Sequence, residues 1–263
     1  MLSRHSRTRV LAVCAAPVLA LFAVAAFAPL PYVLAQPGST ANVLGDDKGR
    51  PVITVTGAPT RETSGQLRMT TIVATGPSVD IDLGQIVDAW FRTDRAVMPK
   101  EAVYPTGDTD AQIERHNADE MQKSQNVAAR AALNYLDKDQ DEVKVDLSLA
   151  DIGGPSAGLF FALGIVDKLD GDGAGGDLTG GRNIAGTGTI SPDGTVGAVG
   201  GVPLKTQAAR RDGASVFLVP RDECSMARAE LPDGLRLVPV TTLKDAVGAL
   251  RELAKKDGKA PSC

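Results

Sequence analysis

Hydrophobic and polar side chains alternate along several short segments, and this two-residue period predicts β-strands. The segment 143–149 (VKVDLSL) has an apolar side chain at every other position, which is typical of a half-buried strand. Residues 63–75 (TSGQLRMTTIVAT) are also strand-like, and the turn sequence SPDG at 191–194 indicates a hairpin. The two strands of that hairpin and two later strands are expected at 184–190, 195–199, 214–220 and 235–240.

Other segments repeat their apolar side chains at the spacing of an α-helix. Asp82 precedes one such segment and predicts a capped helix. We expect this helix to bury a single stripe, formed by Leu83, Ile86, Val87, Trp90 and Phe91. Thr109 and Gln112 have the spacing of a capping box and indicate a long helix that ends near Leu136. The small residues on one face of this helix predict close packing against a neighbour.

The second half of the chain predicts three more helices. Residues 159–169 are apolar on nearly every face, which indicates a helix buried all round. Two further helices should begin near Pro203 and after Thr242. Together these elements predict one α/β domain, with a mixed sheet and covering helices, over residues 51–256, followed by a tail at 257–263.

The first 35 residues have a different character. Residues 10–35 carry no charged side chain, whereas residues 1–9 contain arginines and no acid. A stretch of this length predicts a transmembrane helix with its arginines on the cytoplasmic side and the domain outside the cytoplasm. We therefore interpret residues 1–35 as a basic leader and single-pass membrane anchor, and residues 36–50 as a polar linker. The alternative is a signal peptide cleaved before Gln36, which would give a secreted protein.

Composition and charge exclude several classes of protein. The chain has 263 residues, of which 43% are hydrophobic, and this share excludes a disordered protein. It carries 28 basic and 32 acidic side chains, and this acidic balance argues against a protein that binds nucleic acid through its phosphates. Cys14 falls in the apolar leader, which leaves Cys224 and Cys263 outside the cytoplasm. This pair predicts a disulfide, with two unpaired thiols as the alternative.

The chain has only two histidines, and this limits its chemistry. His5 lies in the basic leader and His116 in a polar helical segment. A metal site built from several histidines is therefore excluded, and a Ser-His-Asp triad would have to use His116. A solvated surface position is the better interpretation of His116. Aspartates 167, 170, 172 and 177 are spaced in a way that suggests calcium, but the EF-hand pattern fails and a solvated acidic loop is expected.

Ser156 lies in GGPSAG, between a predicted strand and a predicted helix. Gly153 and Gly154 allow a ligand to approach the backbone closely, and the start of the helix favours negative charge. Ser156 can therefore be a nucleophile whose oxyanion is held by backbone N–H groups. It can equally be an N-cap that satisfies the helix end, or part of a phosphate cradle. The local sequence leaves these alternatives open.

Lys205 differs from most lysines of this chain because apolar residues surround it in the sequence. Desolvation lowers the pKa of a lysine, and only the neutral amine can accept a proton. Lys205 is therefore a candidate general base for Ser156. The alternative is a lysine at a helix edge whose stem covers apolar surface while its ammonium reaches water.

Two co-linear motifs resemble a known family. Residues 153–164 (GGPSAGLFFALG) and 186–220 (GTGTISPDGTVGAVGGVPLKTQAARRDGASVFLVP) are similar to the proteolytic domain of Lon proteases. The resemblance implies that Ser156 is the nucleophile and Lys205 the base of a Ser-Lys dyad. It also implies that Thr187 is the threonine that hydrogen-bonds the lysine. The likeness extends more loosely from residue 63 to 253.

The leader and the segment TSGQLRMTTI resemble, within that family, the membrane-anchored Lon-like proteases that usually contain a PDZ module. Only a charged turn at 137–142 stands where the module would belong, so we expect the module to be absent. Many Lon domains also have an acid three residues before the serine. In this chain that position is Gly153, and Asp151 lies two residues further upstream, so an acidic contribution to the site is left open.

These features favour an ATP-independent serine endopeptidase that hydrolyses exported or membrane-associated polypeptides and needs no cofactor or metal. No GxxxxGK[ST] phosphate loop occurs in the sequence. The alternatives are a small-molecule kinase that uses the Gly-Ser loop for phosphate and a catalytically silent scaffold. Assembly into a homo-oligomer is left open.

Overall fold

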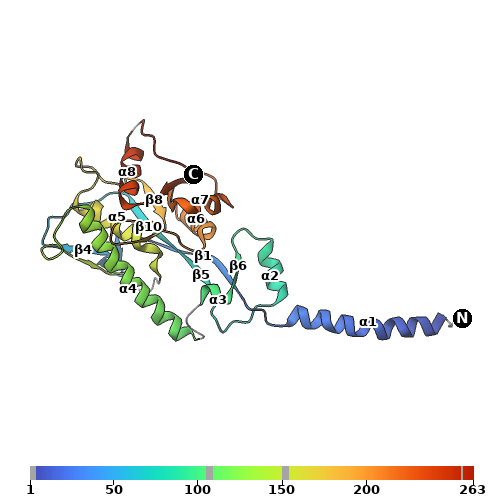
Figure 1. The fold of residues 1–263 in the computed structure, drawn as a ribbon. Coiled ribbons are helices and arrows are strands. Elements are labelled where there is room, and N and C mark those ends of the chain that lie inside the picture. Colours follow the sequence, from blue (N-terminus) through green and yellow to red (C-terminus); the bar gives the residue numbers. More distant parts are fainter. Residues whose placement is uncertain (1–3, 105–108, 150–153, 256) are drawn as a thin grey trace.

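A mixed six-stranded sheet organises the protein (Figure 1). The computed structural model describes residues 4–104, 109–149, 154–255 and 257–263. The strand order is β12-β11-β8-β5-β1-β6; β5, β8, β11 and β12 run parallel, while β1 is antiparallel to both β5 and β6. The strands are β1 (Tyr32–Asn42), β5 (Gln66–Ala74), β6 (Ala96–Pro99), β8 (Asn183–Gly186), β11 (Val216–Pro220) and β12 (Arg236–Val240). The predicted α/β class with a mixed sheet is confirmed.

Three short antiparallel pairs lie outside this sheet: β2 (Asp46–Asp47) with β3 (Arg50–Pro51), β4 (Ile53–Thr56) with β7 (Lys144–Leu147), and β9 (Thr189–Ile190) with β10 (Val196–Gly197). The pair β9–β10 is the hairpin that the SPDG turn predicts. The strand expected at 143–149 is present as β7, but its partner is β4 and not a strand of the main sheet.

The helices begin and end close to the positions expected from their caps. Asp82, Thr109 and Thr242 each accept a hydrogen bond from the backbone of the first turn that follows. The helices are α1 (Arg4–Phe27), α2 (Leu83–Trp90), α3 (Lys100–Val103), α4 (Asp110–Tyr135), α5 (Gly158–Leu169), α6 (Val202–Arg211), α7 (Cys224–Arg228) and α8 (Leu243–Ala254), with 3-10 turns η1 (Pro155–Ala157) and η2 (Arg221–Glu223).

The sequence of strand β11 is a continuous apolar run because both faces of this strand are buried. Val216 and Leu218 belong to the core shared with α4, α5 and α8, whereas Phe217 and Val219 belong to a second core shared with α6 and α7. Successive side chains of a strand point to opposite faces, so both faces of the sheet are covered. Helix α5 is buried along most of its length, as its composition predicts.

The predicted linker at residues 36–50 is wrong. Residues 32–42 form β1, which lies between β5 and β6 inside the sheet. Val33 and Ala35 are fully buried, and the register with β5 shifts between Pro37 and Thr40. The small and polar residues of this strand, together with the irregular register at Pro37, hide its period in the sequence.

The predicted buried stripe of α2 is also wrong. Trp90 and Phe91 are 79% and 83% exposed, Leu83 and Val87 are also exposed, and Ala89 is the buried residue of this helix. Figure 1 shows the reason, because α2 lies near the end of α1 and beside β6, away from the face of the sheet.

The N-terminal helix α1 covers most of the apolar leader. Within the described residues, however, none of the helices combines the length and the apolar character needed to cross a membrane. The expected membrane anchor is therefore not supported. Residues 32–35, which the sequence assigns to the same apolar segment, belong to β1.

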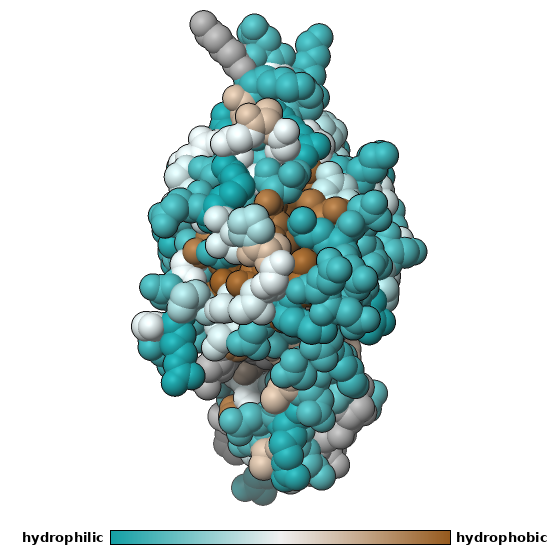
Figure 2. Space-filling view, turned by 90° about the vertical axis from the view of Figure 1, so that its left-hand side faces the viewer, coloured by the Kyte–Doolittle hydropathy of each residue, from teal (hydrophilic) through white to brown (hydrophobic). Residues whose placement is uncertain are grey.

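The side of the molecule that carries β4 is mostly hydrophilic, with apolar side chains confined to a patch near its middle (Figure 2).

His116 is exposed on α4, so the expectation of a solvated surface histidine is confirmed.

Candidate active site

Ser156 lies in the short turn η1 that leads directly into α5. Gly154 precedes this turn with φ +105°, a backbone conformation that residues with a Cβ rarely adopt, and Pro155 fixes the first position of the turn. The N-cap positions of η1 and α5 are occupied by Gly154 and Ala157, so Ser156 does not occupy an N-cap position. Its side chain is half-exposed. Asp151 and Gly153 lie outside the described residues.

Three hydrogen bonds fix the backbone around Ser156. The hydroxyl of Thr187 donates to the Ser156 carbonyl oxygen over 3.2 Å, and the N–H of Gly188 donates to the same oxygen over 3.0 Å. Ser124 on α4 donates from its hydroxyl to the Pro155 carbonyl oxygen over 3.1 Å. The turn is therefore held both by the loop after β8 and by the long helix α4.

Lys205 lies one turn into α6 and is almost completely buried, with 3% of its surface exposed. It therefore does not extend its ammonium into water as a surface lysine would. Gly201 begins the helix with φ +70°, and a Cβ at this position would lie 2.9 Å from the Ile72 side chain. Burial lowers the pKa of Lys205 to about 8, although the negative charge of Glu223 acts in the opposite direction.

Thr187 joins the two predicted residues. The Lys205 Nζ donates a hydrogen bond to Thr187 Oγ1 over 3.1 Å, and this hydroxyl in turn donates to the Ser156 carbonyl. Thr187 itself is fully buried and donates its own N–H to the Leu218 carbonyl of β11. The fold thus gathers Ser156, Thr187 and Lys205 from η1, the loop after β8 and α6.

Sequence reasoning missed two residues near this cluster. Ser124 lies on the small-residue face of α4, and the spacing of 124, 128 and 131 is the signal that could have revealed it. Glu223 is buried in η2, and its Oε1 accepts a hydrogen bond from the Val199 N–H over 3.1 Å. No local pattern distinguishes Glu223 from the exposed acid beside it, Asp222.

Cys224 and Cys263 form a disulfide in the structure. The bond closes a loop with a sequence separation of 39 residues and attaches the C-terminal tail to the residue directly after Glu223. Cys14 is a free, exposed cysteine.

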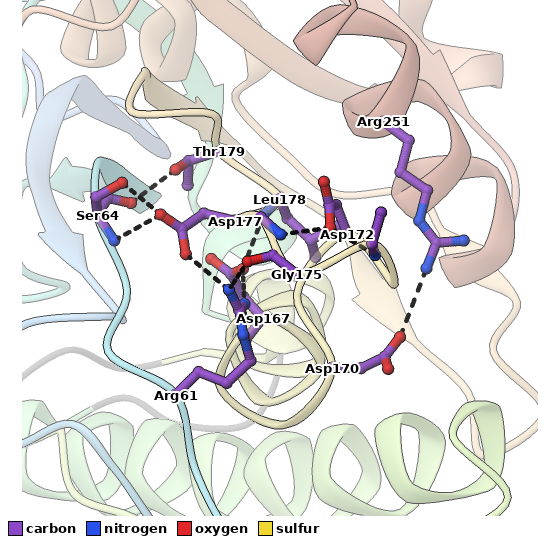
Figure 3. A network of polar contacts seen from close by, with 12 residues as sticks. Arg61, Ser64, Asp167, Asp170, Asp172, Gly175, Asp177, Leu178, Thr179 and Arg251 are labelled. Carbon is purple, nitrogen blue, oxygen red and sulfur yellow. Dashed lines mark hydrogen bonds and ion pairs between the residues drawn. The ribbon is translucent and has the colours of Figure 1, made fainter.

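The acidic loop after α5 folds around arginines and backbone N–H groups (Figure 3). Asp172 accepts from the N–H groups of Ala174 and Gly176, Asp170 pairs with Arg251, and Asp177 pairs with Arg61. In the described part of the chain, no group of three or more His, Cys, Asp or Glu residues is placed to hold a metal ion.

Asp167 departs from the expected solvated loop, because it is fully buried at the end of α5. Its Oδ1 accepts from the Leu178 N–H over 2.8 Å, and Arg61 lies 4.0 Å away. Burial raises the pKa of Asp167 to about 6.

The backbone carbonyl of Ser156 is thus linked through the Thr187 hydroxyl to the buried Lys205 amine, which gathers a serine at a helix start and a candidate base into one cluster. The chain belongs to the Lon protease family: residues 89–250 match the family model of the Lon protease (S16) C-terminal proteolytic domain. The predicted family is therefore confirmed.

Two curated relatives are similar to part of the chain. The Lon protease of Azospirillum brasilense is 34% identical over 114 residues, which cover 41% of this chain and 13% of that protein. The Lon protease of Clostridioides difficile (strain 630) is 40% identical over 83 residues, which cover 32% of this chain and 10% of that protein. The similarity thus spans only a small part of the length of these relatives.

Proposed function

We propose that this protein is an ATP-independent serine endopeptidase that uses Ser156 as its nucleophile and Lys205 as its general base. The buried Lys205 amine, linked through Thr187 to the backbone of Ser156, is the observation that carries the proposal. A pKa near 8 leaves a useful fraction of this amine uncharged close to neutral pH.

In the proposed reaction, neutral Lys205 takes the hydroxyl proton of Ser156 while Oγ attacks the peptide carbonyl carbon. A C–O bond forms, and the carbonyl electron pair moves onto the oxygen. When the C–N bond breaks, the Lys205 ammonium gives its proton to the leaving amine, and an acyl-serine remains. Water then attacks the acyl group, Lys205 accepts the water proton, and Ser156 recovers that proton as the acid leaves.

Backbone N–H groups near Ser156 are the proposed donors to the oxyanion. The N–H groups of Ser156 and of the glycines before Pro155 are candidates, since proline has no N–H to donate. The helix α5 begins directly after this turn, and its positive end favours negative charge at the same place.

We further propose that the substrates are polypeptides outside the cytoplasm. The disulfide between Cys224 and Cys263 supports this location, because disulfides persist mainly in oxidising compartments. The absence of a GxxxxGK[ST] motif from these 263 residues supports hydrolysis without ATP.

The test is digestion of a denatured protein, followed by mass spectrometry, with wild type, Ser156→Ala and Lys205→Ala proteins and no nucleotide. We expect cleavage by wild type only. A serine-reactive fluorophosphonate probe should label wild type and leave Ser156→Ala unlabelled. Equal cleavage by wild type and both variants would overturn the proposal, as would labelling that persists in Ser156→Ala.

A further inference from the structure

Glu223 is a buried acid that the proposed dyad does not use. It ends η2, directly after the fully buried strand β11, and only 3% of its surface is exposed. Its Oε1 accepts from the Val199 N–H, whereas its Oε2 is buried and has no hydrogen-bond partner among the described residues. A buried carboxylate oxygen without a partner is costly, so a stabilising charge is expected nearby.

The surroundings of Glu223 are mostly apolar. Val199 and Val202 pack in the core that also contains Cys224 and Cys263, and helix α6 contacts α7 in this region. In such a medium, opposite charges interact more strongly than they do in water.

Lys205 supplies the opposite charge. Burial lowers the pKa of Lys205, and the negative charge of Glu223 acts in the opposite direction. Burial likewise raises the pKa of Glu223, against the opposing effects of the Val199 N–H and of the positive charge of Lys205. Among the described residues, Glu223 is the acid whose charge opposes the effect of burial on the pKa of Lys205. The charged groups that act on Glu223 are Lys205, from α6, and the neighbouring Asp222.

Glu223 is also linked to Lys205 through the backbone. Val199 lies two residues before Gly201, which begins α6, and Lys205 follows one turn later. The hydrogen bond to Val199 therefore fixes the segment that determines where α6 starts. On the other side, the disulfide of Cys224 holds the residue directly after Glu223.

We propose that Glu223 is a positioning residue of the active site, which anchors the segment leading into α6 and stabilises the Lys205 ammonium that forms when Lys205 takes the Ser156 proton. This inference rests on the proposed function. Glu223 does not take the proton itself, which moves from Ser156 Oγ to Lys205 Nζ and later to the leaving amine. Glu223 provides a buried negative charge that favours the Lys205 ammonium after the transfer.

The test uses Glu223→Gln, which keeps the shape of the side chain and an oxygen acceptor for Val199 but removes the charge. The rate of fluorophosphonate labelling of Ser156 is measured against pH. We expect the midpoint of the acid limb to fall by about one pH unit, because the neutral amine is favoured. The plateau at high pH should fall about 10-fold, because the ammonium in the transition state loses its counter-charge.

The matched control is Asp222→Asn, which removes an equal charge from the exposed neighbour and should leave the midpoint in place. Glu223→Asp keeps the charge and should retain a midpoint closer to that of wild type than Glu223→Gln does. Thermal unfolding of each variant checks that the fold is intact. A lower plateau without a change in midpoint would mean a purely structural role and would overturn the inference. An equal shift in Asp222→Asn would overturn it as well.

A second measurement does not depend on activity. The 13Cε resonance of Lys205, assigned by its loss in Lys205→Met, is titrated in Ser156→Ala and in Ser156→Ala/Glu223→Gln. We expect the midpoint of Lys205 to fall by about one pH unit in the double variant. An unchanged midpoint would overturn the inference. If the probe does not label wild type but the shift in the Lys205 midpoint is retained, the proposed hydrolysis is overturned. The catalytic role of Glu223 then fails with it, whereas the charge interaction between Glu223 and Lys205 stands.

Discussion

Lys205 and Thr187 are joined by a hydrogen bond of 3.1 Å between two buried side chains. The Thr187 hydroxyl uses its lone pair for Lys205 and its hydrogen for the Ser156 carbonyl oxygen, 3.2 Å away. Both the amine and the ammonium form of Lys205 can donate this bond. The threonine can therefore hold the lysine in place throughout the proposed reaction, in which the lysine gains and loses a proton.

Replacement of Thr187 by valine removes the hydroxyl while keeping the shape of the side chain. Lys205 would lose its acceptor and the Ser156 carbonyl one of its two donors, so we expect the cleavage rate to fall about 100-fold. The free energy of unfolding should fall by about 1–3 kcal/mol. Thr187→Ser is the control, since it keeps the hydroxyl and should retain most of the rate. Equal loss in both variants would show that the methyl group, and not the hydroxyl, matters.

The pH dependence of Ser156 labelling follows from the pKa of Lys205. Burial lowers this pKa to about 8 from its ordinary value of 10.5, so the reactive neutral amine becomes abundant as the pH rises through about 8. We expect the labelling rate to rise with pH over this interval and to level off above it. A labelling rate that stays flat from about pH 6 to about pH 9 would contradict this prediction.

Removal of the disulfide by Cys263→Ser should destabilise the protein. The bond closes a loop with a sequence separation of 39 residues, and loop-closure entropy predicts a loss of about 3–4 kcal/mol. Urea unfolding of the variant, and of wild type with and without reductant, measures this loss. Cys14→Ser, which alters the free exposed cysteine, is the control and should unfold as wild type does. Identical unfolding midpoints with and without reductant would argue against a contribution from this bond.

Asp167→Asn tests the buried carboxyl of α5. Burial raises the pKa of Asp167 from 3.8 to about 6, so the folded chain binds this proton more tightly than the unfolded chain does. The contribution of Asp167 to stability is therefore most favourable at low pH, declines as the pH rises from about 4 to about 6, and stays reduced above that.

The free energy of unfolding of Asp167→Asn minus that of wild type should be about 1–3 kcal/mol larger at about pH 6 than at about pH 4. Urea unfolding at both pH values measures the change. Asp170→Asn is the control, because that side chain is largely exposed and pairs with Arg251 at the surface. A stability difference between Asp167→Asn and wild type that does not change with pH would contradict the prediction.

The apolar side chains of α2 should contribute little to stability. Trp90 and Phe91 are 79% and 83% exposed, so replacing either with serine should change the free energy of unfolding by less than about 0.5 kcal/mol. Ala89→Leu is the contrasting variant, since Ala89 is buried and a larger side chain there should cost about 1–3 kcal/mol. A large loss of stability in Trp90→Ser would contradict this prediction and would indicate that the apolar stripe of α2 is buried, as the sequence predicts.

Local sequence predicts most of the individual elements correctly. The caps at Asp82, Thr109 and Thr242 give the starts of α2, α4 and α8, because a side chain that accepts from the first turn acts within four residues. The SPDG turn gives the β9–β10 hairpin for the same reason. The motifs around Ser156, Thr187 and Lys205 identify the candidate site through their resemblance to a family.

The partners of these elements could not be predicted in the same way. The helical period of α2 is real, but Leu83, Val87 and Trp90 are exposed, so periodicity alone could not show whether the stripe is buried. The polar sequence of β1 suggests a linker, yet pairing with β5 and β6 makes it an inner strand. Each outcome depends on residues far away in the chain.

The sequence by itself determined the capped helices and the SPDG hairpin, because capping and turn chemistry act over a few residues. Its motifs also indicated the serine, threonine and lysine, through their resemblance to a family. Only the tertiary structure decided that Lys205 is buried against Thr187 and that Glu223 is buried and accepts a hydrogen bond from the Val199 N–H. Desolvation and charge interaction depend on what surrounds a group in space. The residues of this site come from η1, the loop after β8, α6 and η2. Ser156 and Glu223, the first and last of them, lie 67 residues apart in the sequence.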